Sequence, residues 1–445
     1  MARRSRSGSL GANYYKLMAA STISNLGDGI GVIAYPWLAS AVTRDPVLIA
    51  IVVAAQRLPW LLFTLPAGVI TDRSDRRRIM VGANAIRSVL TFALAGAVFL
   101  RQGSLPSPDE AAAGEVVSTD LLLYLVVIVA TLLMGMAEVL YDNSAQTFMP
   151  SIVAQPNLET ANGRLWSAEM VANNFAGPPL AGALLIVGFA LPFFVDAATF
   201  AASAALIASI AATPRVEAKG PGTGDDCSSW VSEAREGLVW LWRHPLLRPM
   251  AIILGLLNAL SMMALAALVL FAQEVLDTSP TEFALLMTGS AVGGIIGGWS
   301  ASWIAKRLGD GPSLWATLTV GGLANVVIGF ADVWPVVWAM FAASTLVATL
   351  WNVITVSLRQ TIIPDELLGR VNSVYRLFGW GMIPVGALLG GFLVTATEGL
   401  GGGREWALRT PLVVSGALHF ALLAFAAPKL TSAKIAAARI EATGP

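Results

Sequence analysis

The sequence predicts an all-α membrane protein in which twelve transmembrane helices form two six-helix bundles. Hydrophobic residues make up 56% of its 445 residues and charged residues only 13%. A typical soluble domain has about 25% charged residues. Twelve apolar stretches are long enough to cross a bilayer. Short motifs also recur at corresponding places in the first and second halves of the chain, which indicates that one six-helix unit is present twice.

The twelve predicted spans follow from length, because a helix that crosses a bilayer needs about 20 mostly apolar residues. Basic residues gather in every second turn between spans, and the cytoplasmic turns of membrane proteins are the basic ones. We therefore predict a multi-pass protein of the cell (inner) membrane with both termini in the cytoplasm. The spans cover residues 14–42, 46–71, 79–101, 119–148, 160–188, 190–212, 246–274, 281–306, 312–331, 334–358, 367–397 and 407–428.

A cytoplasmic linker at 213–245 divides the chain into an N-terminal bundle at 1–212 and a C-terminal bundle with a cytoplasmic tail at 246–445. The first part of the linker is rich in glycine, proline and charge, which is typical of a flexible connection. The second part has an amphipathic pattern, in which Trp230, Ala234, Leu238, Leu241 and Trp242 share one helix face. This helix lies either in the lipid headgroup layer or on the inner surface of the bundle.

The two predicted bundles share sequence motifs. Gln146-Thr-Phe-Met-Pro150 recurs as Gln360-Thr-Ile-Ile-Pro364, and Gly163-Arg164 recurs as Gly369-Arg370. Repeats of six helices in the same orientation imply a pseudo-twofold axis along the membrane normal. Proteins built in this way bind substrate between the halves and open to each side of the membrane in turn.

The turn between the second and third spans is strongly charged. Six charges fall between Asp72 and Arg78, and each would cost about 2.5 kcal/mol or more inside hydrocarbon, so the turn lies at a membrane face. One interpretation is a topology anchor. The other is a cytoplasmic gate, in which Gly68 permits close helix approach and Asp72, Arg73 and Arg76 pair with neighbouring helix ends.

This turn also carries a family resemblance that extends over nearly the whole chain. Gly68-Val-Ile-Thr-Asp72-Arg-Ser-Asp75-Arg-Arg resembles the signature between the second and third helices of the major facilitator superfamily of transporters. Asp75 stands where that signature has its second glycine. The resemblance implies the major facilitator fold, and it implies that Asp72 acts as a latch which is closed in the outward-open state.

Other stretches narrow the resemblance. Gly177-Pro-Pro-Leu-Ala-Gly182 in the fifth span is similar to the family's antiporter signature, with Ala181 in place of a glycine. The sequences around Asp28, Arg57 and Arg370 look most like the branch that contains siderophore and macrolide exporters. This likeness implies export, and it leaves the substrate open.

Asp28 lies about midway along the first span, between two glycines. An ionisable group at that depth is costly and usually faces a cavity or a partner. Arg57 lies near the middle of the second span, so we expect the two side chains to meet. The pair is either a titratable site, in which Asp28 exchanges a proton and Arg57 tunes it, or a permanent structural ion pair.

Further charged residues are candidates for proton coupling or substrate binding. Glu138 and Asp142 are four residues apart in the fourth span and therefore share one helix face. Carboxylates so close together favour protonation of at least one, and Glu138 is the better candidate because we expect Asp142 to pair with Arg76 in the gate. Glu169 in the fifth span is a second candidate. Arg376 in the eleventh span is placed to neutralise a carboxylate or an anionic substrate.

The fifth span contains a proline-rich segment. Pro178 removes a backbone hydrogen bond and kinks the helix, while Gly177 and Gly182 allow close helix packing. The kink either resists leakage, as the antiporter-like motif implies, or serves packing only. Asn173 and Asn174 line the substrate cavity or tie helices together, and we favour the cavity.

These features predict a secondary active transporter that exports a bulky apolar or amphipathic small molecule, drug- or siderophore-like, by proton antiport and alternating access. The alternatives are uptake of a small solute, proton-coupled or facilitative, and a membrane sensor that does not transport. We expect no enzyme, since the sequence has no nucleotide-binding loop and no nucleophile–base pair.

The expected partners are the small-molecule substrate, protons and the lipid bilayer, and we expect the protein to act as a monomer. One cysteine and two histidines suggest no metal site and no cofactor. Zero net charge gives no reason to expect nucleic acid.

Overall fold

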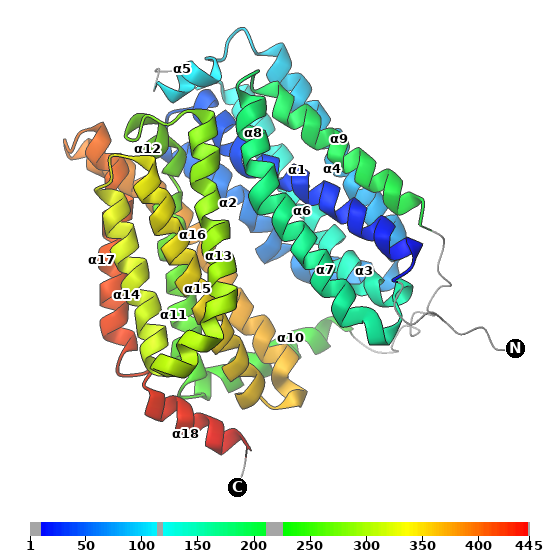
Figure 1. Cartoon of the computed structure of the whole chain (residues 1–445), viewed down its shortest axis with the longest axis vertical. Coiled ribbons are helices and arrows are strands. Elements are labelled where there is room, and N and C mark those ends of the chain that lie inside the picture. Colours follow the sequence, from blue (N-terminus) through cyan, green and yellow to red (C-terminus); the bar gives the residue numbers. More distant parts are fainter. Residues whose placement is uncertain (1–9, 114–118, 211–225, 444–445) are drawn as a thin grey trace, which may run out of the picture. The chain divides into compact units, whose positions relative to one another are not determined.

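The computed structural model describes residues 10–113, 119–210 and 226–443, and within them the chain folds into helices and their connections, with no strand (Figure 1). Two compact units are present. Unit 1 contains Met1–Thr43, Leu58–Ala111 and Glu115–Gly220, and unit 2 contains Arg44–Arg57, Ala112–Gly114 and Pro221–Pro445, as far as these ranges are described. The predicted all-α class is confirmed. The segment Arg44–Arg57 is the part of the predicted N-terminal bundle that groups with unit 2.

The helices of the first half of the chain agree closely with the predicted spans, although two spans are interrupted. The second span breaks at Phe63, and the fifth contains a π-helical turn. The helices are α1 (Ala12–Val42), α2 (Pro46–Leu62), α3 (Thr64–Arg73), α4 (Arg76–Leu100), α5 (Pro108–Ala112), α6 (Leu121–Ile152), η1 (Gln155–Asn157), α7 (Leu158–Val171), η2 (Ala172–Ala176), α8 (Gly177–Leu185) and α9 (Ala190–Ala208).

The second half continues the pattern and adds helices outside the predicted spans. Among the described residues, ten helical stretches are each long and apolar enough to cross a membrane. The two interrupted spans bring these to the predicted twelve. The helices are α10 (Asp226–Arg243), α11 (Leu247–Leu265), α12 (Leu268–Glu274), α13 (Pro280–Leu308), α14 (Asp310–Gly329), α15 (Trp334–Ile362), α16 (Asp365–Gly399), α17 (Arg404–Ala426) and α18 (Ser432–Thr443).

The two units repeat the same internal packing. In unit 1, α1 packs against α9 and against the α7–η2–α8 helix, while α4 packs against α6 and α9. In unit 2, α11 packs against α17 and α16, while α14 packs against α15 and α17. Taken in chain order, these are the same helix pairs. The repeat found in the sequence is therefore also a repeat of helix neighbours within each unit.

The π-helical turn η2 is explained by the two prolines that follow it. Pro178 and Pro179 have no N–H, and each ring clashes with the carbonyl four residues earlier in an α-helix. A wider turn relieves the clash, and the Gly177 N–H donates to the carbonyl of Ala172, five residues earlier. α8 then begins at Gly177 with the prolines in its first turn, where a missing N–H costs nothing.

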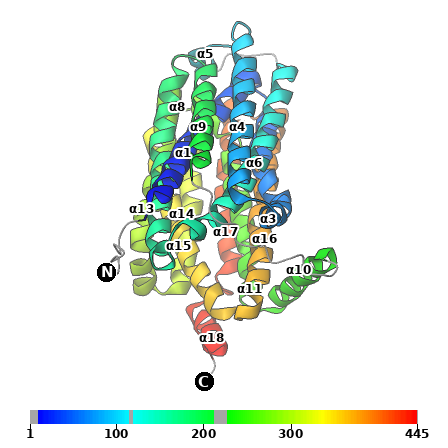
Figure 2. The ribbon, with the colours of Figure 1, turned by 90° about the vertical axis from the view of Figure 1, so that its right-hand side faces the viewer.

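Helix α10 packs on α16, beside the ends of α11 and α16 in Figure 2. A Cβ added to Gly237 would lie 2.8 Å from the backbone of Arg370, and Glu236 forms an ion pair with Arg370 at 2.7 Å. Leu241 is buried, but Trp242 is 46% exposed and stacks on Phe378. The helix therefore packs on the bundle along one edge and leaves part of its predicted apolar face uncovered. The side chains of Trp230 and Ala234 lie outside the described residues.

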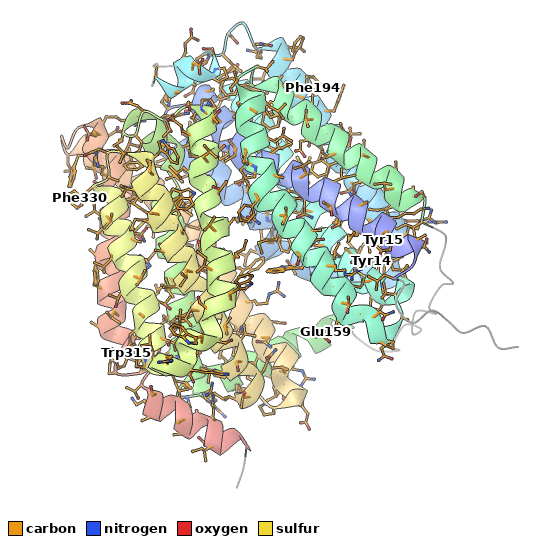
Figure 3. All side chains as sticks on the ribbon, in the orientation of Figure 1. Tyr14, Tyr15, Glu159, Phe194, Trp315 and Phe330 are labelled. Atoms are coloured by element: carbon orange, nitrogen blue, oxygen red, sulfur yellow. The ribbon has the colours of Figure 1, made fainter. Side chains whose placement is uncertain are left out.

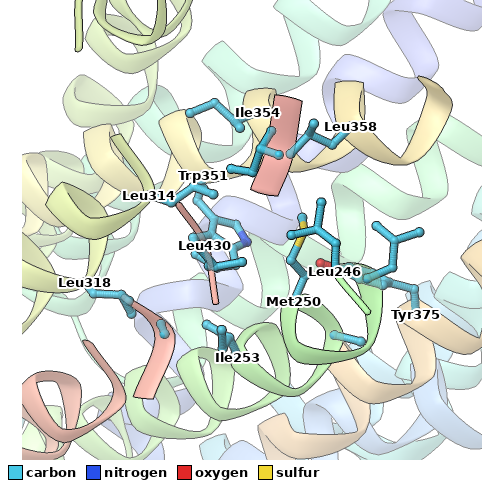
Figure 4. Packing of buried hydrophobic residues seen from close by; sticks show 14 of the residues in the cluster. Leu246, Met250, Ile253, Leu314, Leu318, Trp351, Ile354, Leu358, Tyr375 and Leu430 are labelled. Carbon is cyan, nitrogen blue, oxygen red and sulfur yellow. The ribbon is translucent and has the colours of Figure 1, made fainter. Parts of the chain in front are cut away.

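The core of unit 2 lies at the end of the bundle where α18 is docked. Met250, Leu314 and Trp351 converge there from α11, α14 and α15, and Leu430 joins them from the connection before α18 (Figure 4). The sequence indicated only a tail at this point. Instead, α18 packs against α14 and α15 and buries Ile435 in the same core.

The opposite end of unit 2 is held by ion pairs. Arg44 donates to Gln273 at 2.6 Å. Arg404 pairs with Glu274 at 2.7 Å and with Glu398 at 2.8 Å, and it also donates to the carbonyl of Arg44 at 3.0 Å. These contacts join the start of the segment Arg44–Arg57 to α12, α16 and α17.

Docking of α18 depends on a glycine in α14. A Cβ added to Gly311 would lie 2.6 Å from the backbone nitrogen of Ser432 and 2.9 Å from the carbonyl oxygen of Leu430. We expect Gly311→Ala to destabilise the protein by about 1–3 kcal/mol, the usual cost of overpacking. The apparent melting temperature of the purified protein in detergent measures this.

Gly298→Ala in α13 is the matched control, because a Cβ there would meet no atom within 4 Å. Alanine is the better helix former, so this variant should melt at the same temperature or higher. Equal melting temperatures for the two variants would contradict the role of Gly311.

Candidate functional site

Arg87 occupies the centre of a buried polar site in unit 1. It lies midway along α4, and its side chain is 2% exposed. The guanidinium forms an ion pair with Asp28 of α1, lies 3.5 Å from the hydroxyl of Ser24, and sits over the ring of Phe200 at 3.9 Å. A buried charge is tolerated only with such compensation, and removal of one partner of a buried pair typically costs about 3–5 kcal/mol.

Several further carboxylates surround this pair. Asp196 of α9 is buried, and it interacts electrostatically with both Arg87 and Asp28. Glu138 and Asp142 of α6 interact electrostatically with the same guanidinium. The arginine is therefore flanked by acidic side chains from α1, α6 and α9.

Glu169 of α7 forms the edge of this acidic cluster. It is half-buried, accepts a hydrogen bond from the hydroxyl of Ser21, and interacts electrostatically with Asp28. Tyr14 holds the same two helices together, because its hydroxyl donates to the carbonyl of Ala161 at 3.0 Å (Figure 3).

Small residues allow the helices to converge on Asp28. A Cβ on Gly27 would collide with the side chains of Asp196 and Thr199. On the other side of Asp28, a Cβ on Gly29 would collide with the backbone of Asn173. A Cβ on Gly177 would come within 2.5 Å of the Gly29 Cα. The two glycines that flank Asp28 thus let α9 and the fifth span approach α1 at the level of the carboxylate.

The predicted meeting of Asp28 with Arg57 is wrong. The carboxylate of Asp28 pairs with Arg87, and Arg57 is exposed. The error came from matching depth along neighbouring spans without considering helix rotation. The signal that was missed is Arg87 itself, which is the only charge in the apolar stretch Ile79–Leu100. Asp196 was also missed, although it is a charged residue within the sixth predicted span.

The predicted gate is described only in part. The side chains of Asp72 and Arg73 lie outside the described residues. Arg76 donates to the carbonyl of Thr147 at 3.0 Å, so the expected pair with Asp142 is not formed. The carboxylate of Asp142 instead belongs to the cluster around Arg87.

Two residues of the turn that the prediction did not include, Arg77 and Asp75, contact helix ends. Arg77 donates to the carbonyl of Ile207 at 3.2 Å and to that of Ala208, at the C-terminal end of α9. A positive charge at this end interacts favourably with the helix dipole. Asp75 caps α4 by accepting from the Arg78 N–H, so the departure from the signature glycine provides a helix cap. No described atom lies within 4 Å of a Cβ added to Gly68, so the expected close helix approach is not seen at this position.

The remaining candidates lie apart from the acidic cluster or act through the backbone. Arg376 of α16 is exposed and sits over the ring of Trp380 at 5.2 Å. Asn174 donates to the carbonyl of Met170 within its own helix at 3.3 Å. Pro178 and Gly182 are buried in α8. Among the described residues, no group of three or more His, Cys, Asp and Glu side chains could hold a metal ion.

Comparisons with known proteins agree with this architecture. The Major Facilitator Superfamily model matches residues 17–387. The multidrug efflux pump Tap of Mycobacterium tuberculosis is 27% identical over 406 residues, which cover 90% of this chain and 91% of that protein. The multidrug efflux pump Tap of Mycolicibacterium fortuitum is 25% identical over 393 residues, which cover 85% of this chain and 88% of that protein.

Solved structures show the same fold. A bacterial homologue of the human lysosomal transporter Spinster has a TM-score of 0.72 at 13% identity and covers 98% of this chain and 99% of its own. A bacterial homologue of the iron transporter ferroportin has a TM-score of 0.66 at 18% identity and covers 92% of this chain and 98% of its own. The family match spans most of the chain, and the chain therefore belongs to the Major Facilitator Superfamily, as a multi-pass membrane transporter of small molecules and not an enzyme.

Proposed function

We propose that the protein exports a bulky apolar or amphipathic small molecule in exchange for protons. Similarity to multidrug efflux pumps along 90% of the chain supports export of drug-like compounds. The acidic cluster around Arg87 supports coupling to protons, and it is the observation on which the proposal depends. The acidic side chains come from α1, α6, α7 and α9, so a change of charge at the cluster acts on most of unit 1.

The charge balance of the cluster favours proton binding. Asp28, Glu138, Asp142, Glu169 and Asp196 interact with one another or with the single guanidinium of Arg87. Carboxylates this close repel one another when ionised, and burial adds to the cost of each charge. The cluster is therefore expected to hold protons and to release or take them up when its access to water changes.

Asp28 is the proposed proton carrier, and Arg87 is the charge that responds to it. With Asp28 ionised, the two form the ion pair of the structure. Protonation of Asp28 removes its negative charge. The guanidinium of Arg87 is then attracted mainly by Asp142, Glu138 and Asp196, which already interact with it. Its attraction is thereby transferred from α1 to α6 or α9. Proton binding is thereby converted into a force between helices of unit 1.

The first test removes the proposed proton site. We expect Asp28→Asn to abolish substrate efflux driven by a pH gradient in proteoliposomes, because the amide cannot exchange a proton, while substrate binding persists. Asp120→Asn is the control, since this carboxylate caps α6 at Leu123 and asparagine caps equally well. Efflux by Asp28→Asn with an unchanged pH dependence would refute the coupling role.

The second test measures the ion pair itself. Arg87→Gln leaves Asp28 without its buried partner and should destabilise the protein by about 3–5 kcal/mol. The double variant with Asp28→Asn removes both charges and should recover much of that loss, which a double-mutant cycle of unfolding free energies in detergent quantifies. Strictly additive effects would show that the two side chains are not energetically coupled.

We further propose that both termini and the linker face the cytoplasm of an inner membrane and that the protein works as a monomer. Cys227 is the only cysteine and lies in the linker, so it reports the side of the membrane directly. A membrane-impermeant maleimide should label it in inside-out vesicles and leave it unlabelled in intact cells. The reverse pattern would invert the proposed topology.

A further inference from the structure

Two arginines of unit 2 lie close together, one on α15 and one on α16. Arg359 is half-buried: its Nε donates to the carbonyl of Thr355 at 3.3 Å, and its Nη1 donates to Oδ1 of Asn372 at 3.0 Å. The guanidinium lies over the ring of Tyr375 at 4.1 Å. Arg376 is exposed one helical turn beyond Asn372 and repels Arg359 electrostatically.

No carboxylate of the described side chains balances this pair. Neither arginine forms an ion pair there, and α11 and α15 contain no Asp or Glu. On α16, Glu366 precedes Arg376 by ten residues, which is about 15 Å of helix. On the neighbouring helices α10 and α17, Glu236 is paired with Arg370 and Glu405 with Arg409.

Arg409 shows how unit 2 compensates an arginine that has a structural role. Its guanidinium donates to the carbonyls of Gly329 and Ala331 at the end of α14, both at 3.0 Å, and pairs with Asp332 and Glu405. Arg359 has only neutral partners by comparison. Within the described part of unit 2, no carboxylate neutralises its charge or that of Arg376.

The surroundings of the pair suit an aromatic anion. The hydroxyl of Tyr375 is buried without a hydrogen-bond partner among the described residues, and its ring supports Arg359. Trp380, one turn beyond Arg376, is 39% exposed, and Arg376 sits over its ring at 5.2 Å. A carboxylate or sulfonate can accept two parallel hydrogen bonds from an arginine, and an exposed indole face can stack on an aromatic ligand.

We propose that Arg359 and Arg376 bind the anionic group of an amphiphilic aromatic compound, with Trp380 against its apolar part. This inference rests on the proposed function, because it assigns the compound as a transported substrate. It narrows the substrate class from amphipathic molecules in general to those that carry a carboxylate, sulfonate or similar group.

The test is direct binding to the purified full-length protein in phosphatidylcholine nanodiscs, measured by calorimetry. The probes are 2-naphthoate and its neutral counterpart 2-naphthamide. The wild type should bind the anion more tightly than the amide. Arg376→Gln should weaken 2-naphthoate binding about tenfold or more, the usual effect of losing a charged hydrogen bond, and leave 2-naphthamide unaffected. Arg359→Lys, which keeps the charge and loses the planar fork, should have a smaller effect.

Arg307→Gln is the matched control, because Arg307 is also exposed and also sits over a tryptophan, Trp303, at 5.5 Å. Equal loss in this variant would show an unspecific surface effect and overturn the inference. Equal affinities for the two probes in the wild type would also overturn it. Loss of 2-naphthoate binding when phosphatidylglycerol is added to the nanodisc would assign the arginines to a lipid headgroup and reject a substrate site.

Binding is measured without a pH gradient, so the result is independent of proton coupling. A wild type that exports a neutral apolar dye but does not bind 2-naphthoate overturns this inference and leaves the proposed function in place. A wild type that binds 2-naphthoate through Arg376 but exports nothing supports the anion site and overturns export.

Discussion

The buried guanidinium of Arg87 sets the main constraint on unit 1. It cannot be neutralised by losing its proton, and it lies in the middle of an apolar helix with 2% of its side chain exposed. The neighbouring helices must therefore bring acid to it, and they do so from α1, α6 and α9. The site therefore holds more acidic than basic side chains around one fixed positive charge.

Close packing makes this arrangement possible. Gly27 and Gly29 remove side-chain bulk on both sides of Asp28, so that Asp196 and the backbone of the fifth span can approach α1. Polar contacts between α4 and α9, such as Asn84 to Ser203 at 2.8 Å, fix the helix that carries Arg87. The two glycines that flank Asp28 in the sequence thus act in the fold as contact points between helices.

The sequence predicted the spans almost to their ends, because length and hydropathy alone decide where a chain can cross a bilayer. It predicted much less of the site. Helix rotation determines which charges meet, and packing between distant segments sets that rotation. Because the sequence does not give the rotation, Asp28 was paired with Arg57 and not with its actual partner, Arg87. Asp28, Glu138 and Glu169 were chosen from the sequence as candidate residues, since a charge within an apolar span is visible without knowledge of rotation. They lie in one cluster with Asp142, which had been assigned to the gate. Helix α18 was not predicted because it docks through close contact with Gly311. That contact joins residues far apart in the sequence, so no local pattern indicates it.

The π-helical turn has a mechanical consequence for this cluster. It holds one residue more than an α-helical turn, so the residues before it are offset by about 100° around the axis from where an uninterrupted α-helix would place them. Glu169 lies three residues before the turn Ala172–Ala176. This offset sets the direction in which Glu169 faces, toward Ser21 of α1, while Gly177 of the same span packs on Gly29. The prolines that fix the turn thereby also fix the orientation of this carboxylate.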